Sequence, residues 1–123
     1  MGLKIALITP WGKSTRCGIR TYSENLAHAL AELGVEVYVV RWPRLGRRSR
    51  ELVESSVLDK IPADRVDLIH VQNEYGLFAG DFEDLSAWFY SRLRGLGLPI
   101  VTTMHAVGDW RRDNAASAGS AGR

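Results

Sequence analysis

Residues 3–40 read LKIALITPWGKSTRCGIRTYSENLAHALAELGVEVYVV, and this stretch decides the fold. It opens with a nearly continuous apolar run, residues 3–9, which is typical of a strand buried on both faces of a parallel sheet. From Ile19 an apolar stripe recurs at helical spacing until Gly34, a residue type that commonly ends helices; its members are Ile19, Tyr22, Leu26, Ala29, Leu30 and Leu33. The β-branched and aromatic run 35–40 predicts a second strand. Strand, helix and strand together predict a βαβ unit with a right-handed crossover.

The remainder of the chain repeats this alternation. The patterns predict strands at residues 67–71 and 99–104, and helices at residues 49–60 and from 81 to about 94. Ser49 and Asp81 are residue types that cap helix N-termini, and Pro62 and Gly95 are typical of helix ends. The order predicts a three-layer, doubly wound α/β fold of the Rossmann-like type, with a parallel sheet of about four strands. Ligands of such sheets bind beyond the carboxyl ends of the strands.

Composition bounds the class of protein. The 123 residues carry a formal charge of +2 and are 46% hydrophobic, which indicates one globular domain at most. The apolar runs are too short to cross a bilayer and no signal peptide is evident, so we expect a cytoplasmic protein, with peripheral contact with a membrane left open. Cys17 is the only cysteine and has no evident base partner, so a structural role is favoured over a nucleophilic one. No cofactor or metal is predicted, because only three scattered histidines could ligate one.

The positive charge is concentrated in residues 41–50, RWPRLGRRSR, which hold five arginines. This cluster can attract phosphate groups, anionic lipid or nucleic acid. It contains no aromatic residue beyond Trp42, so we favour a solvated loop. Because the charges of the whole chain are nearly balanced, nucleic acid is not a predicted partner.

The loop after the first strand leads into a helix N-terminus, where free backbone N–H groups favour an anion. Arg20 adds positive charge there, and contact with a phosphate or a sugar is the favoured interpretation; the alternative is that Gly18 serves only the turn. The loop is not a P-loop, because Leu7 stands where the upstream glycine is required. A nicotinamide enzyme is disfavoured too, since the second strand ends at Arg41 and not at an acid.

Two further loops carry polar groups. Residues 72–75, Gln72, Asn73, Glu74 and Tyr75, follow the third strand and can hydrogen-bond a carbohydrate or form an ordinary polar turn. His105 ends the fourth strand, where an imidazole can bond sugar hydroxyls or move a proton. For His70, within a strand, and His28, within a helix, packing or surface exposure is the favoured interpretation.

Four segments together carry a family resemblance: KIALITPWG, RCGIRTYSENLAHALAELGVEVYVV, VDLIHVQNEYGLF and LPIVTTMHAV. They resemble the N-terminal domain of retaining GT-B glycosyltransferases, the group of many mannosyl- and glucosyltransferases and of sucrose and glycogen synthases. The resemblance covers residues 3 to about 107 and implies the strand order 2-1-3-4. It implies hexosyl transfer from a nucleotide-sugar to a sugar or lipid-linked acceptor.

The resemblance also assigns roles. Gly12, Gly18 and Arg20 would lie at the donor diphosphate, and His105 would be the catalytic residue against the donor sugar. The acceptor side would hold Trp11, Gln72, Asn73, Glu74 and Tyr75.

The family's second Rossmann-like domain has no counterpart in this sequence. We therefore expect a truncated N-terminal domain at residues 1–109, followed by a tail or linker at 110–123, and no transferase activity from this fragment by itself. The alternative is a stand-alone binding or oligomerising α/β module for a phosphorylated or sugar ligand. A flavodoxin-like receiver is disfavoured, because no acidic pair follows the first strand. Exposed sheet edges predict a homo-oligomer, a dimer or larger.

Overall fold

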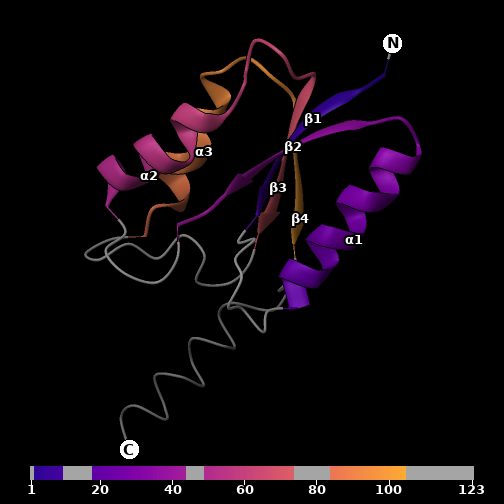
Figure 1. The fold of residues 1–123 in the computed structure, drawn as a ribbon. Helices are drawn as coiled ribbons and strands as arrows, with labels where there is room; N and C mark the ends of the chain where they lie inside the picture. Colours follow the sequence, from indigo (N-terminus) through magenta and orange to yellow (C-terminus); the bar gives the residue numbers. More distant parts are fainter. Residues whose placement is uncertain (1, 10–17, 44–48, 74–83, 105–123) are drawn as a thin grey trace, which may run out of the picture.

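Strands and helices alternate along the chain (Figure 1). A computed structural model describes residues 2–9, 18–43, 49–73 and 84–104, without the side chains of residues 18–21. The strands are β1 (Lys4–Thr9), β2 (Glu36–Arg41), β3 (Leu68–Asn73) and β4 (Ile100–Met104). The helices are α1 (Gly18–Glu32), α2 (Arg50–Ser56), the 3-10 turn η1 (Leu58–Lys60) and α3 (Ser86–Arg94).

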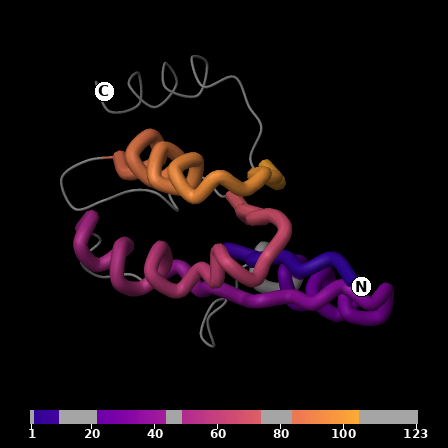
Figure 2. Tube along the Cα trace, turned by 90° about the horizontal axis from the view of Figure 1, so that it is seen from above, coloured from indigo at the N-terminus to yellow at the C-terminus, as the bar shows by residue number. Residues whose placement is uncertain are grey.

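The strands form one parallel sheet in the order β2-β1-β3-β4, so the strand order reverses between β1 and β3. Helix α1 covers one face of the sheet, and α2 and α3 lie side by side on the other (Figure 1, Figure 2). We call these the α1 face and the α2/α3 face. The predicted three-layer, Rossmann-like α/β fold and the order 2-1-3-4 are confirmed. All strands point their carboxyl ends toward the same edge, which we call the carboxyl edge.

The α2/α3 face holds the larger core. Phe89 lies at its centre with no exposed surface, and the Trp42 ring meets it edge-on with 4.8 Å between ring centroids. Trp42 had been interpreted as the aromatic residue of the basic loop; it is 3% exposed and belongs to the core instead. The same cluster contains Ala6, Ile8, Val40, Ile69 and Val71 from the sheet, and Val53, Val57, Leu85 and Leu93 from the helices and their ends.

The α1 face is thinner and more polar. Ile5 and Leu7 are buried, but the side chain of Ser23 is the one fully buried group that α1 contributes among its described residues. The hydroxyl of Thr9 at the end of β1 donates to Ser23 Oγ over 2.7 Å, and both groups are fully buried. A hydrogen-bonded hydroxyl pair therefore occupies the place where an apolar contact would usually lie.

The helix ends agree with the sequence expectation at some positions and differ at others. Gly34 adopts a φ of 86° after α1, as a C-terminal stop requires, and Ser49 caps α2 by accepting from the Leu52 backbone N–H. The predicted helix 49–60 is divided into α2 and η1, and α3 begins at Ser86, not after Asp81. Asp81 itself lies outside the described residues. None of the helices in the described ranges combines the length and the apolar content that a membrane crossing requires.

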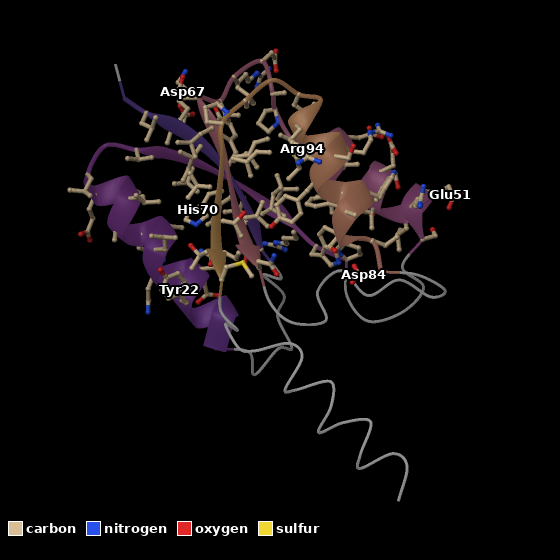
Figure 3. All side chains as sticks on the ribbon, turned by 180° about the vertical axis from the view of Figure 1, so that it is seen from behind. Tyr22, Glu51, Asp67, His70, Asp84 and Arg94 are labelled. Carbon is tan, nitrogen blue, oxygen red and sulfur yellow. The ribbon has the colours of Figure 1, made fainter. Side chains whose placement is uncertain are left out.

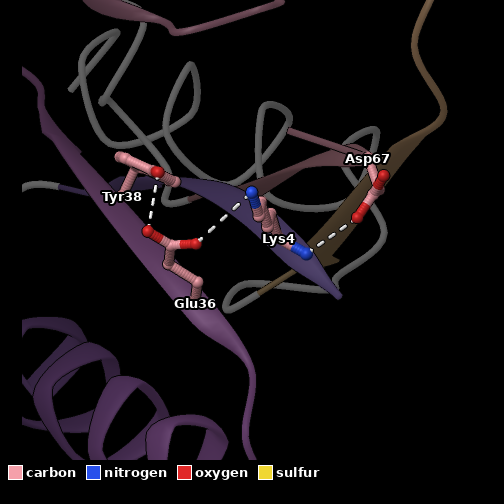
Figure 4. Close-up of polar contacts among 4 residues, drawn as sticks. All are labelled: Lys4, Glu36, Tyr38 and Asp67. Atoms are coloured by element: carbon pink, nitrogen blue, oxygen red, sulfur yellow. Dashed lines mark hydrogen bonds and ion pairs between the residues drawn. The ribbon is translucent and has the colours of Figure 1, made fainter. Parts of the chain in front are cut away.

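The amino end of the sheet is tied by polar contacts (Figure 4). The Lys4 backbone N–H donates to the Asp67 carboxylate over 2.8 Å, which joins β1 to the chain just before β3. Within β2, the Tyr38 hydroxyl donates to Glu36 Oε1 over 2.7 Å. Lys4 Nζ of β1 lies 3.8 Å from Glu36 Oε2. These charged groups stand at the edge opposite to the carboxyl edge.

Candidate functional site

Most of the site residues predicted from the sequence lie outside the described residues. These are Trp11, Gly12, Glu74, Tyr75 and His105, together with Cys17, the arginines at 44, 47 and 48, and the tail at 110–123. Gly18 and Arg20 fall in the first turn of α1, where the backbone alone is described. The proposed roles of all these residues, and the boundary at residue 109, remain predictions.

Gln72 and Asn73 are the predicted site residues whose side chains are described. Both belong to β3, which runs two residues further than the sequence indicated, and not to a loop. Because successive strand residues point to opposite faces, the two side chains cannot line one surface. Gln72 is fully buried on the α1 face, whereas Asn73 is half-buried on the α2/α3 face. The predicted placement of both residues in a loop is therefore wrong, and their acceptor-side role stays a prediction.

Asn73 forms part of a hydrogen-bonded group at the carboxyl edge. Its Nδ2 atom donates to the Tyr90 hydroxyl over 3.1 Å. The same hydroxyl shares a hydrogen bond with Thr102 Oγ1 over 3.2 Å. The three residues come from β3, α3 and β4, and all are half-buried. We call Asn73, Tyr90 and Thr102 the Asn73 cluster.

The core holds the Asn73 cluster in place from behind. Tyr90 follows Phe89 in α3, and their rings meet edge-on with 6.0 Å between centroids. Phe89 is in turn fixed against Trp42. The consecutive placement of Trp88, Phe89 and Tyr90 predicts that the three cannot all face the core. Phe89 is buried, whereas its two neighbours are half-buried and still pack against the core cluster. The Arg50 guanidinium lies over the Trp88 ring, 5.6 Å from the ring centroid.

The α1 face presents a separate polar pair at β3 and β4. His70 Nε2 and Thr103 Oγ1 lie 2.7 Å apart and share a hydrogen bond. His70 is half-buried and lies on the side of the sheet where α1 packs (Figure 3). The favoured sequence interpretation of His70 was packing or surface exposure, and its bond to a neighbouring strand agrees with a packed, hydrogen-bonded role.

The Asn73 cluster is suited to hydrogen bonding and not to charge. An amide, a phenol and a hydroxyl carry no formal charge at neutral pH. Among the described residues, no three His, Cys, Asp or Glu side chains come together in a way that could hold a metal ion. The chemistry that the cluster offers is recognition of polar, uncharged groups.

Tyr90 and Thr102 were not identified from the sequence. Tyr90 is one of three consecutive aromatic residues of α3, of which the sequence predicts at least one at the surface, and Thr102 lies within the predicted strand 99–104. The register between β3 and β4 would have identified Thr102. Asn73 pairs with Met104, and Thr102, two residues before Met104, points to the same face of the sheet. That register depends on tertiary pairing, which periodicity alone does not supply.

Comparisons with known proteins show no family for this chain. No family model matches the chain, and no curated protein matches it. The chain is similar to a solved structure of a 2-deoxyribosyltransferase from the psychrotolerant bacterium Bacillus psychrosaccharolyticus, at 19% identity and a TM-score of 0.49. The match covers 88% of this chain and 78% of that one. A likeness this distant assigns no activity to the chain.

These comparisons correct the functional prediction made from the sequence. The chain was predicted to be a truncated N-terminal domain of a retaining GT-B glycosyltransferase, but the solved structure that matches belongs to a different family and no glycosyltransferase model matches. That identification and the glycosyltransferase function are contradicted. The alternative, a stand-alone module for a phosphorylated or sugar ligand, gains no better support. The parallel strands and their order, which the resemblance also implied, stand on the structure itself.

Proposed function

We propose that this chain is a small-molecule-binding α/β domain whose ligand is uncharged and planar, with a hydrogen-bond donor beside an acceptor. Amides and nitrogen heterocycles have this chemistry. The observation that carries the proposal is the amide of Asn73, which stands half-buried at the carboxyl edge and uses only part of its hydrogen-bonding capacity among the residues that the structure describes. The carboxyl edge is where open parallel sheets bind ligands.

The number of donors and acceptors in the Asn73 side chain supports this ligand class. An asparagine side chain has two N–H donors and one carbonyl acceptor. Within the described residues, the Asn73 side chain makes one hydrogen bond, the donation from Nδ2 to Tyr90. One N–H and the Oδ1 acceptor therefore remain for a ligand, both in the plane of the amide. A planar group with the complementary pair can bond both at once.

The surroundings favour a preformed site. The bond to the Tyr90 hydroxyl fixes the rotation of the Asn73 amide, and Thr102 fixes the hydroxyl. Phe89 supports the Tyr90 ring from the core. A ligand then loses little free energy to ordering these side chains, so more of each new hydrogen bond is retained as affinity.

The absence of charge in the Asn73 cluster sets it apart from a phosphate site. Phosphate groups are bound by arginine, lysine or runs of backbone N–H groups. None of the cluster's three side chains is cationic. We therefore expect an uncharged heterocycle to bind more tightly than a phosphate ester.

Isothermal titration calorimetry tests the proposal with defined probes. The probes are uracil and nicotinamide, with glucose and glucose 1-phosphate for comparison. We expect binding of at least one planar probe, weakened about tenfold in Asn73→Asp, which corresponds to about 1.4 kcal/mol. The matched control is Asn25→Asp, the same change at an exposed position of α1, which should bind like the unchanged protein.

Three outcomes would overturn the proposal. The first is that neither planar probe binds. The second is that binding is equal in the Asn73→Asp and Asn25→Asp proteins, which would place the ligand elsewhere. The third is that glucose 1-phosphate binds more strongly than either planar probe, which contradicts an uncharged site.

A further inference from the structure

Strand β4 forms one outer edge of the sheet, and within the described residues β3 is its one strand neighbour. The Ile69 N–H donates to the carbonyl of Pro99, so the backbone groups of alternate residues from Pro99 onward face β3. The backbone N–H and C=O groups of Ile100, Thr102 and Met104 therefore point away from β3, outward in the plane of the sheet. Such a row of outward groups is a template for another strand.

We propose that a second copy of this chain pairs with β4 in an antiparallel manner, about a two-fold axis that passes through Thr102. A two-fold axis perpendicular to the sheet puts the α1 faces of both copies on one side and their α2/α3 faces on the other. Residues that oppose one another across the axis must therefore point to the same face. In this register Thr102 opposes its own copy, and Ile100 opposes Met104 of the second copy. These are the residues whose backbone groups point outward, so each opposed pair can exchange two hydrogen bonds.

The side chains of β4 fit this register. Val101 opposes Thr103 of the second copy, and β-branched residues pair well across strands. Val101 is 46% exposed and Met104 is 52% exposed, so both have apolar surface to lose on association. No charged residue occurs in β4, whose sequence is IVTTM, so the pairing places no like charges opposite one another.

The other edge of the sheet argues for β4 specifically. Strand β2 begins with Glu36 and ends with Arg41, and both are exposed. Charged residues on an edge strand oppose pairing with a further strand, and β4 lacks this protection. Of the two edges, β4 is the one suited to a second copy.

The dimer would form one continuous sheet with both Asn73 clusters on the same face, because the axis is perpendicular to the sheet. Thr102 keeps its side chain on the α2/α3 face, where it bonds Tyr90, and uses only its backbone at the interface. The inference is independent of the ligand: the chain can dimerise whether or not the Asn73 cluster binds one.

Sedimentation equilibrium over a range of protein concentrations tests the proposal. The chain mass is 13.7 kDa, and we expect a concentration-dependent approach to twice that value. Thr102→Pro removes an outward N–H without removing a donor to β3, since proline is tolerated on an edge strand with that orientation. We expect it to raise the dimer dissociation constant at least tenfold. Thr102→Val also loses the hydroxyl but keeps the N–H, and it should remain a dimer.

A second pair of variants covers the case in which Thr102→Pro fails to fold, as circular dichroism would reveal. Val101→Lys and Val39→Lys introduce the same charge at half-exposed positions of β4 and β2, and Val39 is 38% exposed. We expect Val101→Lys to weaken the dimer and Val39→Lys to leave it unchanged. A monomer at all concentrations, or a dimer weakened by Val39→Lys and not by Val101→Lys, would overturn the proposal.

Discussion

The two faces of the sheet are built differently. On the α2/α3 face, Phe89 and Trp42 anchor a continuous apolar core. On the α1 face, the fully buried groups include the Thr9–Ser23 hydroxyl pair and Gln72, and Val39 and Val101 are more than a third exposed. The comparison shows that apolar packing in this fold is concentrated on one side, whereas the other side depends more on hydrogen bonds.

This difference also locates the candidate site. The Asn73 cluster is on the α2/α3 face, where the core holds Tyr90 in place. The outer strand β4 keeps exposed side chains on both faces, with Val101 46% exposed on the α1 face and Met104 52% exposed on the α2/α3 face. We therefore assign ligand binding to the packed face and self-association to the neighbouring open edge.

The largest expected effect comes from removing the centre of the packed face. Phe89→Ala deletes a fully buried ring and leaves a cavity, so we expect the free energy of unfolding to fall by about 3–5 kcal/mol. Val39→Ala shortens a side chain that is 38% exposed on the α1 face, and it should cost about 1 kcal/mol or less. Urea denaturation of both proteins checks the comparison. Equal losses would show that the two faces contribute alike.

A smaller effect is expected from the polar pair of the α1 face. Ser23→Ala leaves the Thr9 hydroxyl buried without its acceptor, and we expect a loss of about 1–3 kcal/mol in urea denaturation. Replacing both residues, as Thr9→Val with Ser23→Ala, removes both polar groups and should recover part of that loss. If the double variant is as unstable as the sum of the single variants, the two hydroxyls are not coupled.

The smallest effect concerns the amino end of the sheet, where Tyr38 is half-buried. Its hydrogen bond to the Glu36 carboxylate raises the pKa of the Tyr38 phenol above its ordinary value near 10.0. Because the folded pKa is the higher one, the bond's contribution to stability is complete below the unfolded pKa and is lost as the pH rises through the folded pKa. Glu36→Gln should lower the Tyr38 pKa in an NMR titration. An unchanged pKa would mean that the carboxylate is not its cause.

The sequence predicts the architecture well because periodicity reports local structure. The apolar run of β1, the glycine after α1 and the Ser49 cap all lie where the structure has them. The buried face of α1 is less well predicted. The apolar stripe included Tyr22 and Leu33, yet these are 46% and 80% exposed, and the fully buried Ser23 was not in it. A hydroxyl can be buried there only because Thr9 bonds it, and no helical pattern encodes that partner.

The candidate site was less predictable than the fold. Asn73 was selected from the sequence because polar residues follow the third strand, but it was grouped with Gln72, which points to the opposite face. Tyr90 and Thr102 join it through pairing of β3 with β4 and packing of α3, both of which are tertiary contacts. The glycosyltransferase resemblance rested on segment order, which many parallel α/β sheets share.

The central claim, that the Asn73 amide is a preformed ligand contact, is tested most directly by NMR of its side-chain NH₂ resonances. The two Nδ2 protons of any asparagine give distinct signals, and we expect those of Asn73 to be further apart than in free asparagine, because one proton is bonded to Tyr90. On addition of uracil or nicotinamide, the other proton should shift and saturate together with the backbone signals of Thr102 and Met104. If the ligand shifts signals elsewhere and leaves the Asn73 side-chain amide unchanged, the claim is contradicted.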